Sequence, residues 1–183
     1  MNYYGAKDLA DSFRTVRKNT LVIANEIGEE QYGFRPTPET RTVAQMLFHI
    51  SVVPKLQEHI HGELKLNTLE GFDFPGYFMP IMAAEQESRT KPQLIALLTE
   101  SGERYAKFLE SLSDDFLGQH VSFRAGMTPP SKSRFEMLLG VKEHEMHHRA
   151  QLMMMERMVG IVPHLTRDMM ARMAAMQSGK ATA

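Results

Sequence analysis

The chain has 183 residues, with 21 lysines and arginines against 22 aspartates and glutamates and a formal charge of −1. It contains no cysteine, which excludes disulfides, iron–sulfur clusters, cysteine zinc sites and a thiol nucleophile, so any metal site must use His, Asp or Glu ligands. The near-neutral charge is not that of a nucleic-acid-binding protein, and no stretch reaches the ~20 apolar residues that cross a membrane.

We therefore expect a single domain covering residues 1–183, since this length suits one hydrophobic core. The first residues lack the charged-then-apolar pattern of a signal peptide, which indicates a soluble cytoplasmic protein. We expect it to bind neither nucleic acid nor a membrane.

The first predicted helix begins near Leu9 and ends near Gly28. Its apolar residues recur at steps of three and four positions, which places them on one face of an α-helix, and only Thr20 interrupts this stripe. Gly28 is a favourable residue at a helix end, and the two prolines within residues 33–38 prevent the helix from continuing.

A second helix is predicted to begin at Thr42, which forms a capping box with Gln45. Pro54 lies inside this helix and lacks the N–H of a regular helical residue, so we expect a kink there. Residues 62–88 contain several glycines and prolines and are predicted to form a long connection, apolar in composition.

Two further capping boxes, in residues 90–93 and 133–136, predict the starts of two more long helices. Their apolar stripes end near Leu112 and Val159, and a shorter tail helix is predicted over residues 163–177. No segment shows the two-residue alternation of a β-strand. The predicted fold class is therefore all-α, a four-helix bundle with a short C-terminal helix.

Two histidines lie in the middle of the apolar stripe of the fourth helix. His144 and His148 are four residues apart, which places their rings about one turn apart on one helix face. Both rings then point into the core, where each unpartnered imidazole costs roughly 1–3 kcal/mol. A metal ion satisfies both at once; histidines that only form hydrogen bonds in the core are the alternative.

His49 is the candidate for a third metal ligand, because it borders the apolar face of the second helix. His147 lies at the edge of the stripe of the fourth helix, where it can support a ligand or contact solvent. The remaining histidines are expected at the surface: His59, His61, His120 and His164.

Gln151 points to the same face as the two histidines of the fourth helix and could orient a ligand or substrate. Glu145 is predicted to lie at the solvated margin of the stripe. Residues 144–148 also match H-E-x-x-H, in which Glu145 would be the general base of a zinc protease. This interpretation is disfavoured, because Met154 stands where the extended motif has a histidine and no glutamate follows Glu156.

Three segments follow one another in a characteristic order: Gln-Tyr-Gly-Phe-Arg-Pro-Thr-Pro-Glu-Thr-Arg-Thr-Val at 31–43, Met-Leu-Phe-His-Ile at 46–50, and His-Glu-Met-His-His-Arg-Ala-Gln-Leu at 144–152. Together they resemble the DinB/YfiT-like family of four-helix-bundle metalloproteins, whose last motif is H-x-x-x-H-R-x-Q-L. The resemblance covers nearly the whole chain and implies an up-down-down-up bundle. Carried over residue by residue, it implies metal binding by His49, His144 and His148.

Three neutral histidine ligands leave a coordination position open for water or substrate, as in a catalytic site. Nitrogen ligands suit a divalent metal, with Zn²⁺ or Ni²⁺ ahead of Fe²⁺. The resemblance implies two activities on a small molecule. Transfer of an external low-molecular-weight thiol stands slightly ahead of metal-dependent hydrolysis. The third hypothesis is a non-catalytic metal- or ligand-binding stress protein, and no catalytic residue is assigned.

We expect residues 72–82 and 120–130 to form the walls of the substrate pocket, where Arg124 or Arg149 could meet a substrate carboxylate. Methionines gather toward the C-terminus, and those at 153–155 cover too wide an arc of a helix to lie wholly in the core. We expect the tail helix or a second subunit to cover some of them, and we predict a homodimer.

Overall fold

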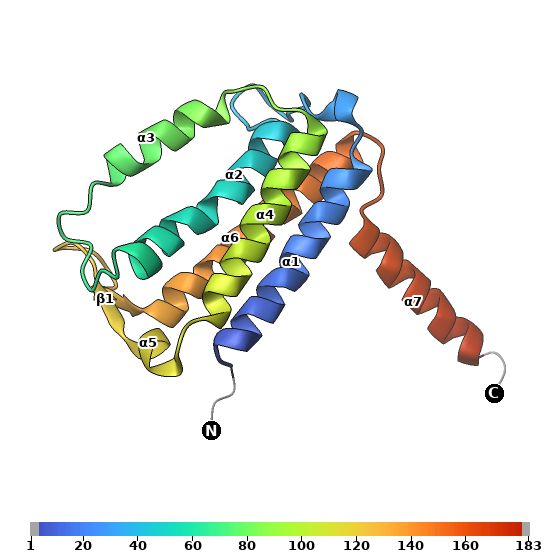
Figure 1. Cartoon of the computed structure of the whole chain (residues 1–183). Helices are drawn as coiled ribbons and strands as arrows, with labels where there is room; N and C mark the ends of the chain where they lie inside the picture. Colours follow the sequence, from blue (N-terminus) through green and yellow to red (C-terminus); the bar gives the residue numbers. More distant parts are fainter. Residues whose placement is uncertain (1–3, 181–183) are drawn as a thin grey trace.

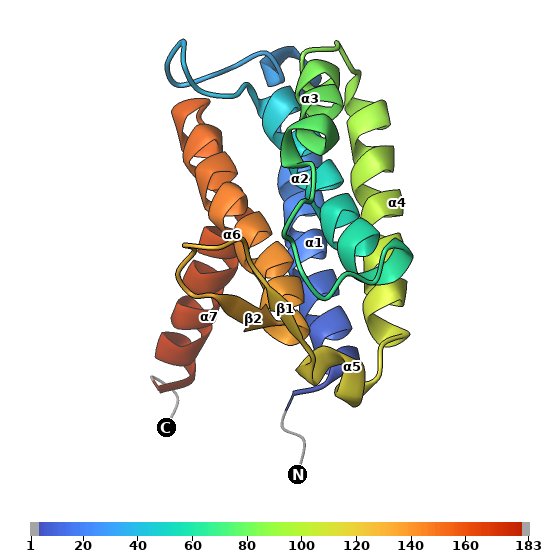
Figure 2. The same ribbon diagram turned by 90° about the vertical axis from the view of Figure 1, so that its left-hand side faces the viewer.

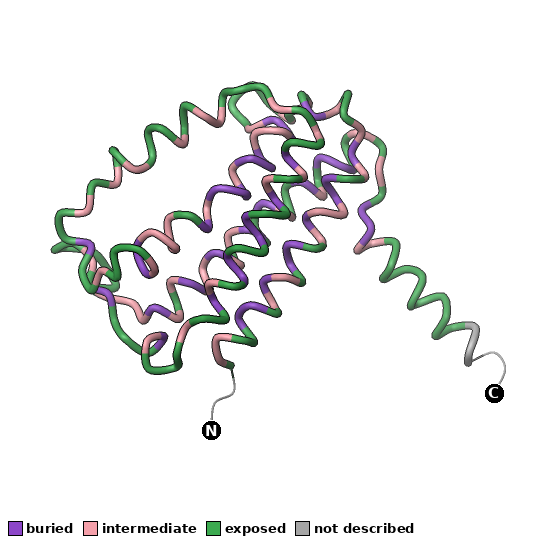
Figure 3. The backbone as a smooth tube through the Cα atoms, viewed as in Figure 1, coloured by how far each residue is buried: buried purple, intermediate pink, exposed green. Residues whose placement is uncertain are grey.

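The computed structural model describes residues 4–180. Four long helices form a bundle, and their buried faces enclose its core (Figures 1 and 3). They are α1 (Ala6–Glu26), α2 (Val43–Gln57), α4 (Lys91–Glu110) and α6 (Arg134–Met158). Their buried side chains include most of the predicted apolar stripes, so the all-α bundle is confirmed.

Contacts at the helix ends give the direction of each helix. The ammonium group of Lys91, at the start of α4, donates to the carbonyl oxygen of Ile27, just past the end of α1, at 2.6 Å. α4 therefore starts where α1 ends and runs antiparallel to it. Figure 1 shows α2 also starting at this end and α6 ending there, which confirms the up-down-down-up arrangement.

All three predicted capping boxes are present. At the start of α2, the backbone N–H of Gln45 donates to Thr42 Oγ1 at 3.1 Å, and the N–H of Thr42 donates to Gln45 Oε1 at 2.9 Å. The same reciprocal pairs begin α4 and α6. They satisfy N–H groups that have no partner within the helix, which explains why these helices start at the predicted residues.

The chain must return along the bundle between α2 and α4, because these two helices run in the same direction. It does so through the π-helical segment η2 (Glu58–Glu63) and helix α3 (Phe74–Glu85), which lies outside α2 (Figure 2). The irregular connection predicted over 62–88 is thus wrong for these twelve residues of α3. Every residue of α3 is half-buried or exposed, so the sequence lacks the one-sided stripe that marks a helix.

Two shorter connections complete the bundle. Between α1 and α2 lies the 3₁₀ turn η1 (Glu29–Gln31). Between α4 and α6 lie the short helix α5 (Asp114–Gly118) and the antiparallel strands β1 (His120–Ser122) and β2 (Ser131–Ser133). Strands of three residues are too short to show an alternating pattern, which explains why the sequence predicted none.

The tail helix α7 (His164–Lys180) projects away from the bundle (Figure 1). It leaves a set of large methionines exposed on α6 and on itself: Met154, Met158, Met169, Met170, Met173 and Met176. The tail helix therefore does not cover these residues of α6, and the homodimer stays a prediction. Among residues 4–180, no helix combines the length and the hydropathy that crossing a bilayer requires.

A buried ion pair joins all four helices of the bundle. Arg17 of α1 donates to Glu145 of α6 through Nε at 2.9 Å to Oε1 and through Nη2 at 2.9 Å to Oε2. The same guanidinium donates to the carbonyl oxygen of Leu98 and to Ser101 Oγ on α4, and to the carbonyl oxygen of Ile50 on α2. Both charged residues are almost fully buried, so the prediction of a solvated Glu145 is wrong.

Three residues of the sequence accommodate this pair, two through hydrogen bonding and one by leaving space. Thr20, which interrupts the apolar stripe of α1, donates its hydroxyl to Glu145 at 2.7 Å. Gly102 of α4 lies so close to Arg17 that a Cβ there would come within 2.8 Å of Arg17 Cγ. Pro54 has no N–H for the carbonyl oxygen of Ile50, and this oxygen accepts from Arg17 at 3.4 Å instead.

Removal of either charged partner of this pair is expected to destabilise the bundle strongly. Glu145→Gln or Arg17→Met leaves the other group buried without its counter-ion, at a cost of about 3–5 kcal/mol of unfolding free energy. The double variant should cost clearly less than the sum of the two single variants. Urea denaturation followed by circular dichroism measures all three.

Arg14, a partly exposed arginine of α1, provides the matched control. It pairs with Glu103 at 3.1 Å and also with Glu110 and Asp11, on the outer face of α1 and α4. Arg14→Met should cost no more than about 1 kcal/mol, because solvent screens a surface pair. A loss at Arg17 equal to that at Arg14 would contradict the central role of the buried pair.

A second buried carboxyl, that of Glu156 on α6, has no ion-pair partner among the described residues. It is 0% exposed, and neither of its oxygens has a hydrogen-bond partner in the described part of the chain. Burial, together with the nearby charge of Glu26, raises the pKa of Glu156 to about 7. The folded protein therefore holds this proton more tightly than the unfolded chain does.

The stability contributed by protonated Glu156 should be present below pH 4.5 and should be lost as the pH rises to about 7. Glu156→Gln keeps the neutral form at every pH, so the variant should be more stable than the wild type at pH 8, by about 2–3 kcal/mol, and similar to it at pH 4.5. Urea denaturation of both proteins at a series of pH values measures the difference. A constant difference across this range would contradict the raised pKa.

Candidate metal centre

Three histidine rings meet between α2 and α6. His49 comes from α2, and His144 and His148 come from successive turns of α6. His144 Nε2 lies 3.3 Å from His49 Nε2 and 3.2 Å from His148 Nε2. One ligand atom from each ring lies within 4.8 Å of the other two. The structure thus brings together the three side chains that the sequence analysis selected.

The spacing of these nitrogens fits a metal ion. A zinc ion with Zn–N bonds of about 2.0–2.1 Å in tetrahedral geometry holds two nitrogens about 3.3 Å apart. The two separations measured from His144 Nε2, 3.3 Å to His49 and 3.2 Å to His148, agree with this value. The residues present therefore fit a divalent metal with three histidine ligands and a further open position.

The outer nitrogens of two rings face groups that orient them. His148 Nδ1 lies 2.7 Å from Gln151 Oε1, an acceptor, so this nitrogen carries the proton and Nε2 keeps its lone pair. His49 Nδ1 lies 3.6 Å from Glu85 Oε2. His144 Nδ1 is buried and has no hydrogen-bond partner among the described residues. Carboxylates and amides in such positions fix the orientation of metal-binding rings.

All three rings favour the neutral form. Burial, the charge of Arg41 and the neighbouring histidines lower the pKa of His49 to about 3. Burial and His148 lower the pKa of His144 to about 4, and burial also lowers the pKa of His148. Neutral imidazoles have the free lone pair that a metal requires, so these rings need no proton loss near pH 7 to become ligands.

Glu85 and Arg41 belong to the site although the sequence analysis selected neither. Glu85 stands at the end of α3, and its Oε1 accepts from Arg41 Nε at 2.7 Å while its Oε2 faces His49. Glu85 is the only charged residue within the twelve residues of α3. The sequence feature that could have pointed to Glu85 is its position as a single carboxylate at the end of an apolar segment. We did not use this feature, because residues 62–88 were interpreted as an irregular connection.

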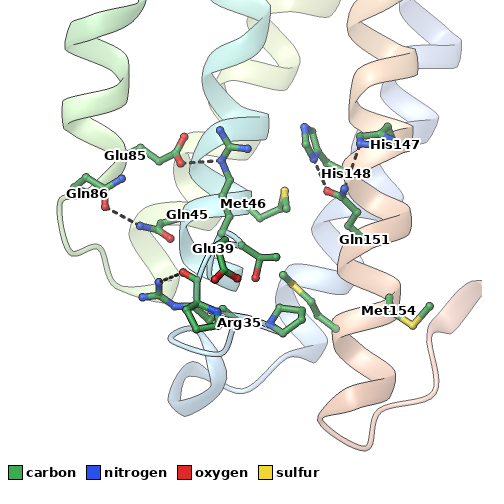
Figure 4. A pocket seen from close by; sticks show the side chains of 15 residues that line it. Arg35, Glu39, Gln45, Met46, Glu85, Gln86, His147, His148, Gln151 and Met154 are labelled. Carbon is green, nitrogen blue, oxygen red and sulfur yellow. Dashed lines mark hydrogen bonds and ion pairs between the residues drawn. The ribbon is translucent and has the colours of Figure 1, made fainter.

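A cleft of about 760 Å³ opens beside His148 (Figure 4). Its walls come from three segments, residues 35–46, 85–86 and 147–155. The predicted walls, residues 72–82 and 120–130, are wrong. Only the C-terminal end of α3 reaches the cleft, and the β1–β2 segment lies at the other end of the bundle (Figures 1 and 2). Of the two arginines proposed to meet a substrate, neither Arg124 nor Arg149 lines it.

The H-E-x-x-H interpretation fails at its glutamate. Both oxygens of Glu145 accept from Arg17, and Oε1 also accepts from Thr20, on the side of α6 that faces α1. A carboxylate held in this way by a buried guanidinium is not available as a general base for a substrate. Residues 144–148 of this chain therefore supply metal-ligand candidates without the protease base.

The other histidines divide into two groups. His59, His120 and His147 are at least partly exposed, as expected, and His147 lines the cleft. The surface positions predicted for His61 and His164 are wrong, since both are buried. His61 follows Ile60 in the π-helical turn η2 and accepts from Arg134 Nη1 at 2.8 Å, and burial lowers its pKa to about 4.

Comparisons with known proteins agree with this architecture. A family model described as the DinB superfamily matches residues 12–152. A DinB-like protein of Bacillus subtilis, YjoA, is 20% identical, with a TM-score of 0.60 over 83% of this chain and 92% of that one. YfiT of the same organism, described as a probable metal-dependent hydrolase with an unusual four-helix bundle topology, is 16% identical, with a TM-score of 0.64 over 85% and 88%.

A conserved protein of Enterococcus faecalis has a TM-score of 0.59 at 14% identity, over 85% of this chain and 97% of that one. Identities this low establish a shared fold and nothing finer. A search among curated proteins found no match.

Metal binding should depend on the three histidines and, more weakly, on Glu85. The wild type should bind one equivalent of Zn²⁺, and His49→Ala, His144→Ala or His148→Ala should each weaken binding at least about 100-fold, because two histidines hold the ion far less tightly than three. Glu85→Gln should weaken it by about 10–100-fold through loss of the carboxylate facing His49. Competition with a zinc chelator measures these affinities.

His120→Ala is the matched control, because His120 is exposed on β1 and lies outside the three-histidine cluster. Its zinc affinity should equal that of the wild type. If the His49 variant bound zinc as tightly as the His120 variant, the three-histidine site would be refuted.

Proposed function

We propose that this chain, which belongs to the DinB superfamily, is a metal-dependent hydrolase of a small molecule. One observation carries the proposal. Three histidine rings converge at metal-ligand spacing, and one of them, His148, lines an open cleft of about 760 Å³, the size of an ordinary small-ligand pocket. YfiT, which shares the fold, is described as a probable metal-dependent hydrolase, and this description supports the same reaction class here.

Three protein ligands are the number that catalytic zinc sites use, whereas structural sites usually have four. His49, His144 and His148 would hold the ion, with Zn²⁺ or Ni²⁺ ahead of Fe²⁺. When bound, such an ion supplies Lewis acidity that activates water or a thiol near neutral pH.

The residues of the chain contribute orientation and a shaped cleft. Gln151 and Glu85 face the outer nitrogens of His148 and His49, so they would help to orient these two rings as ligands. Met46 and Met155 provide apolar surface in the cleft, where a substrate would displace water. Glu145 is committed to Arg17, so we assign no general base.

Transfer of an external thiol is the second candidate. The volume of the cleft favours it, since about 760 Å³ accommodates both a small thiol and an electrophile. The thiol must come from outside the chain, because the sequence has no cysteine. A metal held by His49, His144 and His148 would supply the positive charge that lowers the pKa of such a thiol.

Turnover assays on the zinc- and nickel-loaded protein should separate the two reactions. We expect metal-dependent hydrolysis of at least one member of a panel of nitrophenyl esters and anilides, without added thiol and abolished in His144→Ala. Turnover only when glutathione or cysteine accompanies an electrophile such as monobromobimane would replace hydrolysis by thiol transfer. Metal binding without either activity would overturn the enzymatic proposal in favour of a binding protein.

A further inference from the structure

Arg41 is fixed beside the metal centre by the carboxylate that also faces a metal-ligand candidate. Its Nε donates to Glu85 Oε1 at 2.7 Å, and the second oxygen of Glu85 lies 3.6 Å from His49 Nδ1. The side chain of Glu85 is only 10% exposed, so this link is shielded from bulk water. The guanidinium of Arg41 is therefore held at a set distance from the metal site instead of moving freely in solvent.

The remaining donors of Arg41 are free. A guanidinium has five N–H groups, four of them on its terminal nitrogens. Among residues 4–180, no hydrogen bond or ion pair involves Arg41 Nη1 or Nη2, whereas Nε is used by Glu85. Arg41 lines the cleft, and its side chain is 37% exposed. Two parallel N–H donors of this kind match the two oxygens of a carboxylate.

The other charges of the cleft favour a monoanion. Arg35 also lines it, but its Nη1 donates to the carbonyl oxygen of Pro38 at 3.2 Å, on an exposed loop. Glu39 and Glu85 supply two negative charges along the same walls. These charges balance those of Arg35 and Arg41, so the side chains give the cleft no excess positive charge for a multiply charged phosphate. A single carboxylate needs only the free donors of Arg41.

The surface between these polar groups is apolar. Met46, Met154 and Met155 contribute flexible side chains to the same cleft. Methionine surfaces adapt to varied apolar groups. A ligand that spans the cleft therefore needs a polar reacting group for the metal, a short apolar middle and an anionic end.

We propose that Arg41 binds the carboxylate of a small organic acid whose other end reacts at the metal, so that the substrate class is carboxylate-bearing esters, amides or similar acyl compounds. The proposal rests on the proposed function. It assigns Arg41 a direct contact with substrate and assigns Glu85 two positioning tasks, one toward His49 and one toward Arg41.

Paired metal-binding probes test this assignment. Succinic, adipic and suberic monohydroxamic acids carry a metal-binding hydroxamate and a carboxylate, and the unsubstituted alkyl hydroxamic acids of equal length lack the carboxylate. For at least one of the three chain lengths, the wild-type zinc protein should bind the carboxylated probe at least about 10-fold tighter than the neutral probe of the same length. This is the gain expected from a charge-assisted hydrogen bond. Isothermal titration calorimetry measures each affinity.

Arg41→Gln should remove this preference while leaving the neutral probe within about threefold of its wild-type affinity. Arg124→Gln, which removes a cation outside the cleft, should retain the full preference. Equal weakening of both probes in Arg41→Gln, or no preference at any chain length in the wild type, would overturn the proposal, because Arg41 would then serve only the metal site.

The failure of the proposed function has a different signature. If the neutral hydroxamate does not bind the zinc-loaded protein at all, the open metal position is absent and the proposed function fails. Titration with adipate then decides the role of Arg41 by itself. Adipate binding that is lost in Arg41→Gln supports the carboxylate site, and no adipate binding, or binding unchanged in the variant, refutes it.

Discussion

The buried ion pair of Arg17 and Glu145 is the constraint around which the bundle is arranged. Two charges in an apolar interior are tolerated only when nearly all of their hydrogen-bonding capacity is satisfied. Here the partners come from every bundle helix, namely Thr20 on α1, the carbonyl oxygens of Ile50 on α2 and Leu98 on α4, and Glu145 on α6. Any relative shift of the helices would break one of these bonds, so the pair fixes their register.

This register also determines the geometry of the metal centre. Ile50 follows His49 on α2, and Glu145 follows His144 on α6, so the two anchored residues are the direct neighbours of two metal-ligand candidates. Successive residues of a helix point about 100° apart. The ion pair therefore faces α1 and α4 while the imidazoles face the gap between α2 and α6. A rigid scaffold of this kind holds the Nε2 atoms of His49 and His148 within 3.3 Å of His144 Nε2 before any ion binds.

The sequence predicted what depends on helical periodicity and local capping. His144, His148 and His49 were found because their positions relative to apolar stripes follow from 3.6 residues per turn. The same reasoning predicted the wrong environment for Glu145. Periodicity gives the direction of a side chain around the helix axis, but it does not show that Arg17 lies opposite on α1. Glu85 and Arg41 meet only because α3 returns to the start of α2, a long-range contact with no local pattern.

The Arg17–Glu145 and Arg41–Glu85 pairs differ in how many nitrogens of the arginine remain free for a ligand. Arg17 has all three of its nitrogens engaged inside the bundle, so it has nothing left to offer a ligand. Arg41 donates only through Nε, to Glu85, and it lines the cleft with its two terminal nitrogens available to a ligand. A guanidinium loses most of its recognition capacity when it is saturated by protein, and it gains selectivity when a single carboxylate fixes its orientation. The partial engagement of Arg41 therefore makes it the cation of the cleft that is suited to recognise a substrate.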